Sequence, residues 1–121
     1  MSHHPIVHIE LSTRDREADA TFYNKLFGWE FKHFPEMNYV TFTAEGGPGG
    51  GLNPINDNYP AGTVVFYVET DDIKATLEKV EKLGGKSLMP PQEVPDVGWI
   101  SLFQDLTGNM IGLLQPVMNA S

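Results

Sequence analysis

The chain contains no cysteine among its 121 residues. This absence excludes disulfide bonds, thiol catalysis and thiolate metal sites. No apolar run approaches the roughly 18 residues that a membrane-spanning helix needs. The first residues, MSHHPIVHIEL, also lack the basic stretch and the apolar segment of a secretory signal. We therefore expect a cytoplasmic protein with no membrane partner.

Positive charge is scarce, because 8 lysines and arginines face 16 acidic side chains, for a net charge of −8. Binding to a phosphate backbone needs clustered lysine and arginine, and the chain has no such cluster. Nucleic acid is therefore not expected as a partner. The acidic surface would favour cationic ligands, although acidity that merely keeps the protein soluble is the simpler interpretation.

The segment from Glu45 to Thr63, EGGPGGGLNPINDNYPAGT, is rich in glycine, proline and asparagine. Its composition is similar to that of a phosphate-binding loop, but no Gly-Lys-Ser/Thr follows. Pro48, Pro54 and Pro60 also oppose a helix after it. We interpret the segment as a short strand over residues 50–53 and a connection between the two halves of the chain.

The chain contains two similar segments, VHIELSTRDREADATFYNKLFG over residues 7–28 and VVFYVETDDIKATLEKVEKLGG over residues 64–85. Each reads as an apolar strand, a polar turn, an amphipathic helix and a glycine. A repeat near half the chain length predicts a single domain, residues 1–121, built from two modules at about 5–53 and 62–117. Paired modules often form a cleft at their junction, where a ligand binds.

Periodicity and turn residues predict the order βαβββ in both modules. In the first module we expect a helix that starts at Ser12 and Thr13 and ends at Gly28, and strands over Ile6–Leu11, Trp29–Phe34, Tyr39–Thr43 and Gly50–Asn53. In the second we expect a helix opened by Thr70 and Asp71 and ended by Gly84 and Gly85. Its strands should cover Thr63–Glu69, Lys86–Met89, Trp99–Gln104 and Met110–Gln115, with Pro90 and Pro91 as a break and Asp105–Asn109 as a turn.

Several of these segments resemble motifs of the vicinal oxygen chelate superfamily, which includes glyoxalase I, extradiol dioxygenases and bleomycin-resistance proteins. The residues that carry the resemblance are His8, Phe22-Tyr23, Leu26 to Trp29, Val68 to Ile73, Gly84-Gly85, Leu102 to Asp105 and Gly108-Asn109. The chain looks closest to the glyoxalase-like branch, although Leu106 and Leu114 replace a common Pro and Trp. The resemblance implies an α+β fold whose two βαβββ modules form a curved, cup-like mixed sheet with helices on the outer face.

In metal-dependent members of that superfamily, His or Glu ligands from four strands point into the cup. Of these positions only the first is matched here, by His8. The others fall on Val65, on Gly112 and within residues 50–53, which contain no His, Asp or Glu. Since three protein ligands are the usual minimum for a catalytic metal, we expect no metal cofactor. A relocated divalent metal site that uses Glu10 and Glu69 is the alternative.

Strand alternation predicts which side chains face the cup. It selects His8 and Glu10 on the first strand, Tyr67 on the fifth, and Met110 and Gly112 on the last. The seventh strand could present Trp99, Ser101 and Phe103, although its phase is open. Gly112 either leaves room for a ligand or only allows close strand packing. The candidate ligand-binding residues are His8, Glu10, Tyr67, Trp99, Met110 and Gly112.

Two functions are compatible with this pattern. The first is a small-molecule-binding protein of the glyoxalase/bleomycin resistance type that holds an organic ligand without the usual metal. The second is an enzyme, a lyase, isomerase or dioxygenase, that uses a relocated metal or His8 as a general base. A lone inward histidine can equally be a hydrogen-bonded structural group, so no catalytic residue is assigned. The resemblance also implies a homodimer.

Overall fold

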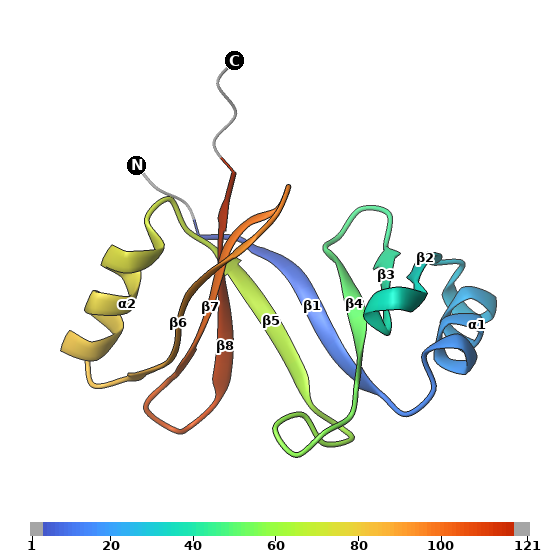
Figure 1. Cartoon of the computed structure of the whole chain (residues 1–121), viewed down its shortest axis with the longest axis horizontal. Helices are drawn as coiled ribbons and strands as arrows, with labels where there is room; N and C mark the ends of the chain where they lie inside the picture. The colour runs from blue at the N-terminus through green and yellow to red at the C-terminus, as the bar shows by residue number, and fades with distance from the viewer. Residues whose placement is uncertain (1–3, 118–121) are drawn as a thin grey trace. The chain divides into compact units, whose positions relative to one another are not determined.

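In the computed structural model, which describes residues 4–117, the chain has the predicted α+β architecture (Figure 1). The described residues form two compact units. One comprises residues 8–65, and the other comprises the residues up to Val7 together with those from Phe66 onward. We call them the N-terminal and the C-terminal unit. Each carries one four-stranded mixed sheet and one long helix.

The N-terminal unit contains β1 (Ile6–Thr13), α1 (Arg16–Phe27), β2 (Glu30–Phe34), the short 3₁₀ helix η1 (Pro35–Met37), β3 (Tyr39–Thr43) and β4 (Gly49–Pro54). Its strands lie in the order β2-β3-β4-β1. The pairs β2/β3 and β3/β4 are antiparallel, whereas β1 and β4 are parallel.

The C-terminal unit repeats this arrangement with β5 (Val64–Glu69), α2 (Ile73–Lys82), β6 (Lys86–Val94), β7 (Gly98–Gln104) and β8 (Met110–Pro116). Its strand order is β5-β8-β7-β6, with β5 and β8 parallel and the other pairs antiparallel. The predicted order βαβββ in both halves is therefore confirmed.

Each helix covers one face of its own sheet. In the N-terminal unit α1 contacts β2, β3 and β4, and the core beneath it contains Ala20, Val40 and Leu52. In the C-terminal unit α2 contacts β6, β7 and β8, above a core of Ile73, Leu77 and Leu113. Because strand side chains alternate between faces, the residues on either side of these positions belong to the opposite face, which we call the open face of each sheet.

Both helices begin later than their sequence suggested. Ser12 and Thr13 belong to β1, and the N-cap of α1 is Asp15, whose carboxylate accepts a hydrogen bond from the Ala18 N–H at 3.1 Å. Thr13 is buried and its hydroxyl donates to the Asp19 carboxylate at 2.5 Å, which ties the end of β1 to the helix. A side-chain oxygen that accepts from the third helical N–H is the usual N-cap arrangement.

The second helix starts in the same way. Its N-cap is Asp72, which accepts from the Ala75 N–H at 3.0 Å, so the predicted start at Thr70 and Asp71 was wrong by one or two residues. The end predicted for α1 is confirmed, because Gly28 adopts a left-handed φ of 77° that favours glycine. Within the described residues neither helix is long and apolar enough to cross a membrane.

The break predicted at Pro90 and Pro91 was also wrong, because β6 runs through both prolines. The register between β6 and β7 is irregular from Met89 to Gln92, where the two prolines lie. β6 stands at the edge of the sheet, and an edge strand tolerates a proline because one row of its N–H groups has no partner strand.

Candidate functional site

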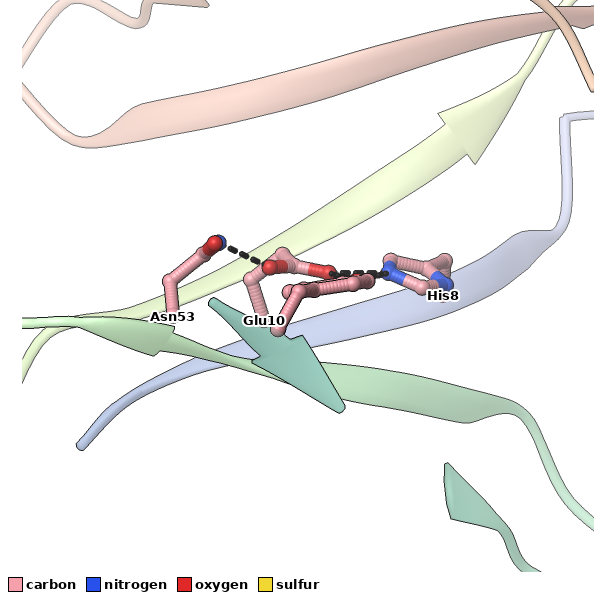
Figure 2. Close-up of polar contacts among 4 residues, drawn as sticks. His8, Glu10 and Asn53 are labelled. Atoms are coloured by element: carbon pink, nitrogen blue, oxygen red, sulfur yellow. Dashed lines mark hydrogen bonds and ion pairs between the residues drawn. The ribbon is translucent and has the colours of Figure 1, made fainter. Parts of the chain in front are cut away.

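A polar cluster lies on the open face of the N-terminal sheet, with Glu10 at its centre (Figure 2). One Glu10 carboxylate oxygen accepts a hydrogen bond from the Tyr39 hydroxyl at 2.5 Å and contacts His8 Nε2. The other oxygen accepts from Asn53 Nδ2. Glu10 is only 8% exposed, so three polar partners compensate for most of the solvation that this carboxylate loses. We call His8, Glu10, Tyr39 and Asn53 the Glu10 cluster.

The strand register explains how residues distant in the chain meet here. Glu10 in β1 pairs with Gly51 in β4, and Gly51 pairs with Thr41 in β3. Tyr39 and Asn53 each lie two residues from one of these positions, so they share the face of Glu10. A side chain at Gly51 would overlap the Tyr39 hydroxyl, which shows that Tyr39 reaches Glu10 across the glycine.

His8 is the most accessible member of the hydrogen-bonded pair. Its side chain is 32% exposed, against 10% for Glu10. Because an ionised carboxylate only accepts hydrogen bonds, the contact with Glu10 fixes the His8 proton on Nε2 and leaves the lone pair of a neutral ring on Nδ1. A carboxylate that orients an imidazole in this way sets its tautomer. A neutral ring in this tautomer has its acceptor nitrogen at Nδ1, where it can accept a hydrogen bond or a proton.

Two further predicted residues meet on the open face of the C-terminal sheet. Tyr67 in β5 pairs with Gly112 in β8, and an added Cβ at Gly112 would lie 2.6 Å from Cε2 of Tyr67. The Tyr67 ring thus occupies the room that the glycine leaves. Met110 stands two residues from Gly112 on the same face of β8. Of the two interpretations of Gly112, close packing is the one that this contact favours.

Trp99 lies on the opposite face of its sheet. Ser101 is completely buried and pairs with the core residue Leu113, and Phe103 packs against the same core, so their face is the one that α2 covers. Trp99 alternates in phase with both. The inclusion of Trp99 among the residues of the open face was therefore wrong, and the phase that the sequence left open is the one in which Trp99 faces α2. Its sequence, WISLFQ, places large apolar residues at both parities, so alternation alone could not decide between the faces.

Most of the chain matches the model of a known protein family. The model of the Glyoxalase/Bleomycin resistance protein/Dioxygenase superfamily matches residues 5–113. The chain belongs to this superfamily. The resemblance noted in the sequence is thereby confirmed.

Relatives of known name are similar over most of the chain. A glyoxylase-like domain-containing protein from Didymella fabae is 36% identical over 115 residues, which cover 88% of this chain and 90% of that protein. A putative glyoxylase from Mycobacterium tuberculosis is 32% identical over 114 residues, but these cover 88% of this chain and only 44% of the relative. The chain thus spans less than half of that mycobacterial protein.

Solved structures share the fold. A glyoxalase/bleomycin resistance protein/dioxygenase superfamily member from Vibrio splendidus superposes with a TM-score of 0.69 at 21% identity, covering 93% of this chain and 99% of the other. At this level of identity the likeness shows the fold alone, and chemistry has to be argued from the side chains of this superfamily member.

The residues present do not fit the metal centre of metal-dependent superfamily members. No group of three or more His, Cys, Asp and Glu side chains able to hold a metal occurs within residues 4–117. His8 and Glu10 supply two ligands where three are usual. Three of the roughly four lone-pair positions of the Glu10 carboxylate already face donors from Tyr39, Asn53 and His8.

The sequence interpretation missed Tyr39 and Asn53. Both lie in segments that were correctly predicted as strands, and Asn53 lies in the glycine-rich strand that was examined only for metal ligands. Alternation of Tyr39 with Val40 and Phe42 could have placed it on the polar face. The amide of Asn53 carried no signal by itself, because its role depends on which strand lies beside β4.

Proposed function

We propose that the Glu10 cluster is the centre of a binding site for a small organic molecule that is held without a metal ion. The observation that carries the proposal is the arrangement of Tyr39, Asn53 and His8 around the Glu10 carboxylate on a sheet face that α1 leaves uncovered. A nearly buried carboxylate with three partners is a rigid element, and it holds His8 ready for a ligand.

The exposed fractions of the Glu10 and His8 side chains indicate which of them a ligand can reach. Glu10 is nearly buried and engaged, whereas about one third of His8 is exposed. His8 is therefore the member of the pair that would meet the ligand, through a hydrogen bond with a polar group of the ligand. One hydrogen bond of this kind contributes about 1 kcal/mol, or up to roughly tenfold in affinity.

The test is a thermal-shift screen of a metabolite library, with EDTA in one arm and Mn²⁺, Ni²⁺, Zn²⁺ or Fe²⁺ in the others. A ligand that binds the folded state raises the melting temperature. We expect stabilisation that is the same with and without metal, and no stoichiometric metal by elemental analysis. The variant His8→Ala should weaken binding by about tenfold or less, and His33→Ala, in the exposed strand β2, should leave it unchanged. Stabilisation that requires a divalent ion would contradict the proposal.

A second candidate is proton-transfer catalysis, which the contact between His8 Nε2 and Glu10 favours. A histidine oriented by a carboxylate is a common general base. Each ligand found in the screen would be incubated in D₂O and followed by NMR for exchange of a carbon-bound proton. Catalysis predicts exchange that His8→Ala abolishes, whereas a binding protein shows none. A metal-dependent lyase or dioxygenase would in addition need a third metal ligand beside His8 and Glu10.

We further propose that the protein is a homodimer, as the family resemblance implies, and that it is cytoplasmic. Light scattering coupled to size-exclusion chromatography gives the solution mass directly. Twice the chain mass of 13.4 kDa is expected, and a mass of one chain across a range of concentrations would refute the dimer.

A further inference from the structure

A large groove runs along one flank of α2, entirely within the C-terminal unit. Its volume is about 730 Å³. Phe103 lies in its wall together with the apolar side chains of Val80, Leu83 and Leu106. Leu83 and Leu106 are 69% and 78% exposed, so the groove presents apolar surface to solvent. Such a volume is within the range that small ligands occupy.

The corresponding flank of the N-terminal unit is filled by the chain itself. Trp29 stacks on Phe42 with ring centroids 4.7 Å apart and an interplanar angle of 7°. Tyr23 and Phe27 lie on the same indole, at centroid distances of 5.3 and 5.1 Å. Trp29 thus covers Phe42, and the rings of Tyr23 and Phe27 in turn pack on Trp29.

Strand register shows that Phe103 is the counterpart of Phe42. Phe42 pairs with Phe31, the second residue of β2, and Phe103 pairs with Ser87, the second residue of β6. Both β2 and β6 start two residues after a left-handed glycine, so the two pairs occupy equivalent places in their units. Counted from the Asp N-caps, Val80 stands where the N-terminal unit has Tyr23. Counted from the left-handed glycines Gly28 and Gly84, the counterparts of Phe27 and Trp29 are Leu83 and Gly85.

Phe103 therefore lacks the rings that cover Phe42. Within the described part of the chain no aromatic side chain stacks on it. The chain cannot fill the place from Gly85 either, because an added Cβ there would lie 2.7 Å from the Gln104 carbonyl oxygen and 2.8 Å from Cγ1 of Val80. An aromatic surface that is covered by rings in one unit is thus left open in the other.

Charge distinguishes one end of the groove. Asp71 lines it just before α2, is exposed, and makes no hydrogen bond or ion pair with any residue that the structure describes. The neighbouring carboxylates of Asp72 and Asp105 accept from backbone N–H groups. Lys79, a cation in the lining, is two helical turns beyond Asp72, about 10 Å along the axis. The end at Asp71 thus favours positive charge, in keeping with the net charge of −8.

We propose that this groove binds a small planar aromatic cation, with its ring against Phe103 and its charge towards Asp71. The site is separate from the Glu10 cluster and does not depend on the function proposed for it. Offset stacking of the kind that Trp29 makes on Phe42 would supply the ring contact, and Asp71 would add a solvent-exposed charge contact.

The experiment uses 9-aminoacridine, a planar cation at neutral pH, with neutral acridine and anionic anthracene-9-carboxylate as matched probes. Binding to the full chain is measured by fluorescence titration and by chemical-shift mapping. We expect saturable binding in the order cation, neutral, anion, with shifts concentrated in α2 and residues 103–106. Ala75→Trp, in the exposed groove wall, should lower affinity at least tenfold. Ala18→Trp, at the same N-cap spacing in α1, should leave it unchanged.

The charge contact has its own control. Asp71→Asn should weaken binding of the cation by up to about fivefold, the usual range for an exposed ion pair, without affecting acridine. Asp57→Asn, which changes net charge equally outside the groove, should affect neither probe. The proposal is overturned by an absence of saturable binding, by binding that Ala75→Trp leaves intact, by equal affinity for the anion, or by shifts centred on His8 and Glu10.

Discussion

The Tyr39 hydroxyl donates a hydrogen bond of 2.5 Å to the Glu10 carboxylate, across the glycine at position 51 and across 29 residues of chain. The bond joins β3 to β1, two strands that do not pair with each other. It therefore ties together both sides of β4 on the face where the Glu10 cluster lies.

Removing this donor should destabilise the protein. Tyr39→Phe leaves one acceptor position of a nearly buried carboxylate unmet, which costs about 1–3 kcal/mol in free energy of unfolding. Urea denaturation followed by circular dichroism measures the change. Tyr59→Phe is the matched control, because the Tyr59 hydroxyl makes no hydrogen bond with the part of the chain that the structure describes. An equal effect of the two substitutions would show that the Tyr39 hydroxyl does not stabilise Glu10.

The contact between Gly112 and Tyr67 predicts a steric effect in β8. Gly112→Ala places a Cβ against the Tyr67 ring, and forcing a methyl group into such a contact costs about 1–3 kcal/mol. The double variant with Tyr67→Ala should recover part of this loss, since the two residues interact directly. Gly47→Ala, where an added Cβ meets nothing within 4 Å, should be nearly neutral. Independent, additive effects of the two substitutions in denaturant titrations would refute the steric explanation.

The two aspartate N-caps should contribute similarly to stability. Asp15→Ala and Asp72→Ala each remove the acceptor for one helical N–H, and each should cost about 0.5–2 kcal/mol. Asp57→Ala serves as the control, because its carboxylate makes no hydrogen bond or ion pair with the described residues. If either cap variant matched that control in its urea midpoint, the helix would not begin as described.

The turn between β7 and β8 predicts a dependence on pH. The side-chain amide of Asn109 donates to the Asp105 carboxylate and, with backbone N–H groups of the turn, lowers the pKa of Asp105 below its ordinary value of 3.8. A lowered folded-state pKa contributes stability that is fully present above the unfolded-state pKa and is lost as the pH falls through the folded-state pKa.

Wild type should therefore exceed Asp105→Ala in melting temperature at pH 7, and the difference should shrink below pH 3.8. Because the carboxylate is exposed, high salt should reduce the difference as well. A series of melting curves between pH 7 and pH 2 at two salt concentrations provides the measurement. A difference that grew on acidification would have the wrong sign for a lowered pKa.

Local patterns in the sequence predicted most elements but not where the two helices begin. The two apolar strands and amphipathic helices repeat strongly, so their type and order were correct. The helix starts were wrong because Thr13 and Thr70 are good N-cap residues that tertiary packing instead buries, Thr13 as the last residue of β1 and Thr70 directly after β5. The prolines of β6 were misinterpreted because proline occurs both where a strand breaks and within an edge strand.

The candidate site could be predicted only where it was local. His8 and Glu10 lie on one strand, so alternation alone brought them together. Tyr39 and Asn53 reach them through the order of strands in the sheet, which no spacing in the sequence specifies. Trp99 was placed on the wrong face because its strand is apolar on both sides, and the core under α2 decided its phase.

The parallel pairing of β1 with β4 also determines when the sheet can form. His8 pairs with Gly49, and β5 pairs with β8 in the same way. The first strand of each unit can therefore form its parallel hydrogen bonds only after the last strand of that unit is present. Contacts between residues so far apart in sequence slow folding, because the intervening chain loses its freedom before the contact stabilises it. During synthesis β1 therefore emerges long before its partner, and its apolar residues Ile9 and Leu11 depend on the later strands for cover.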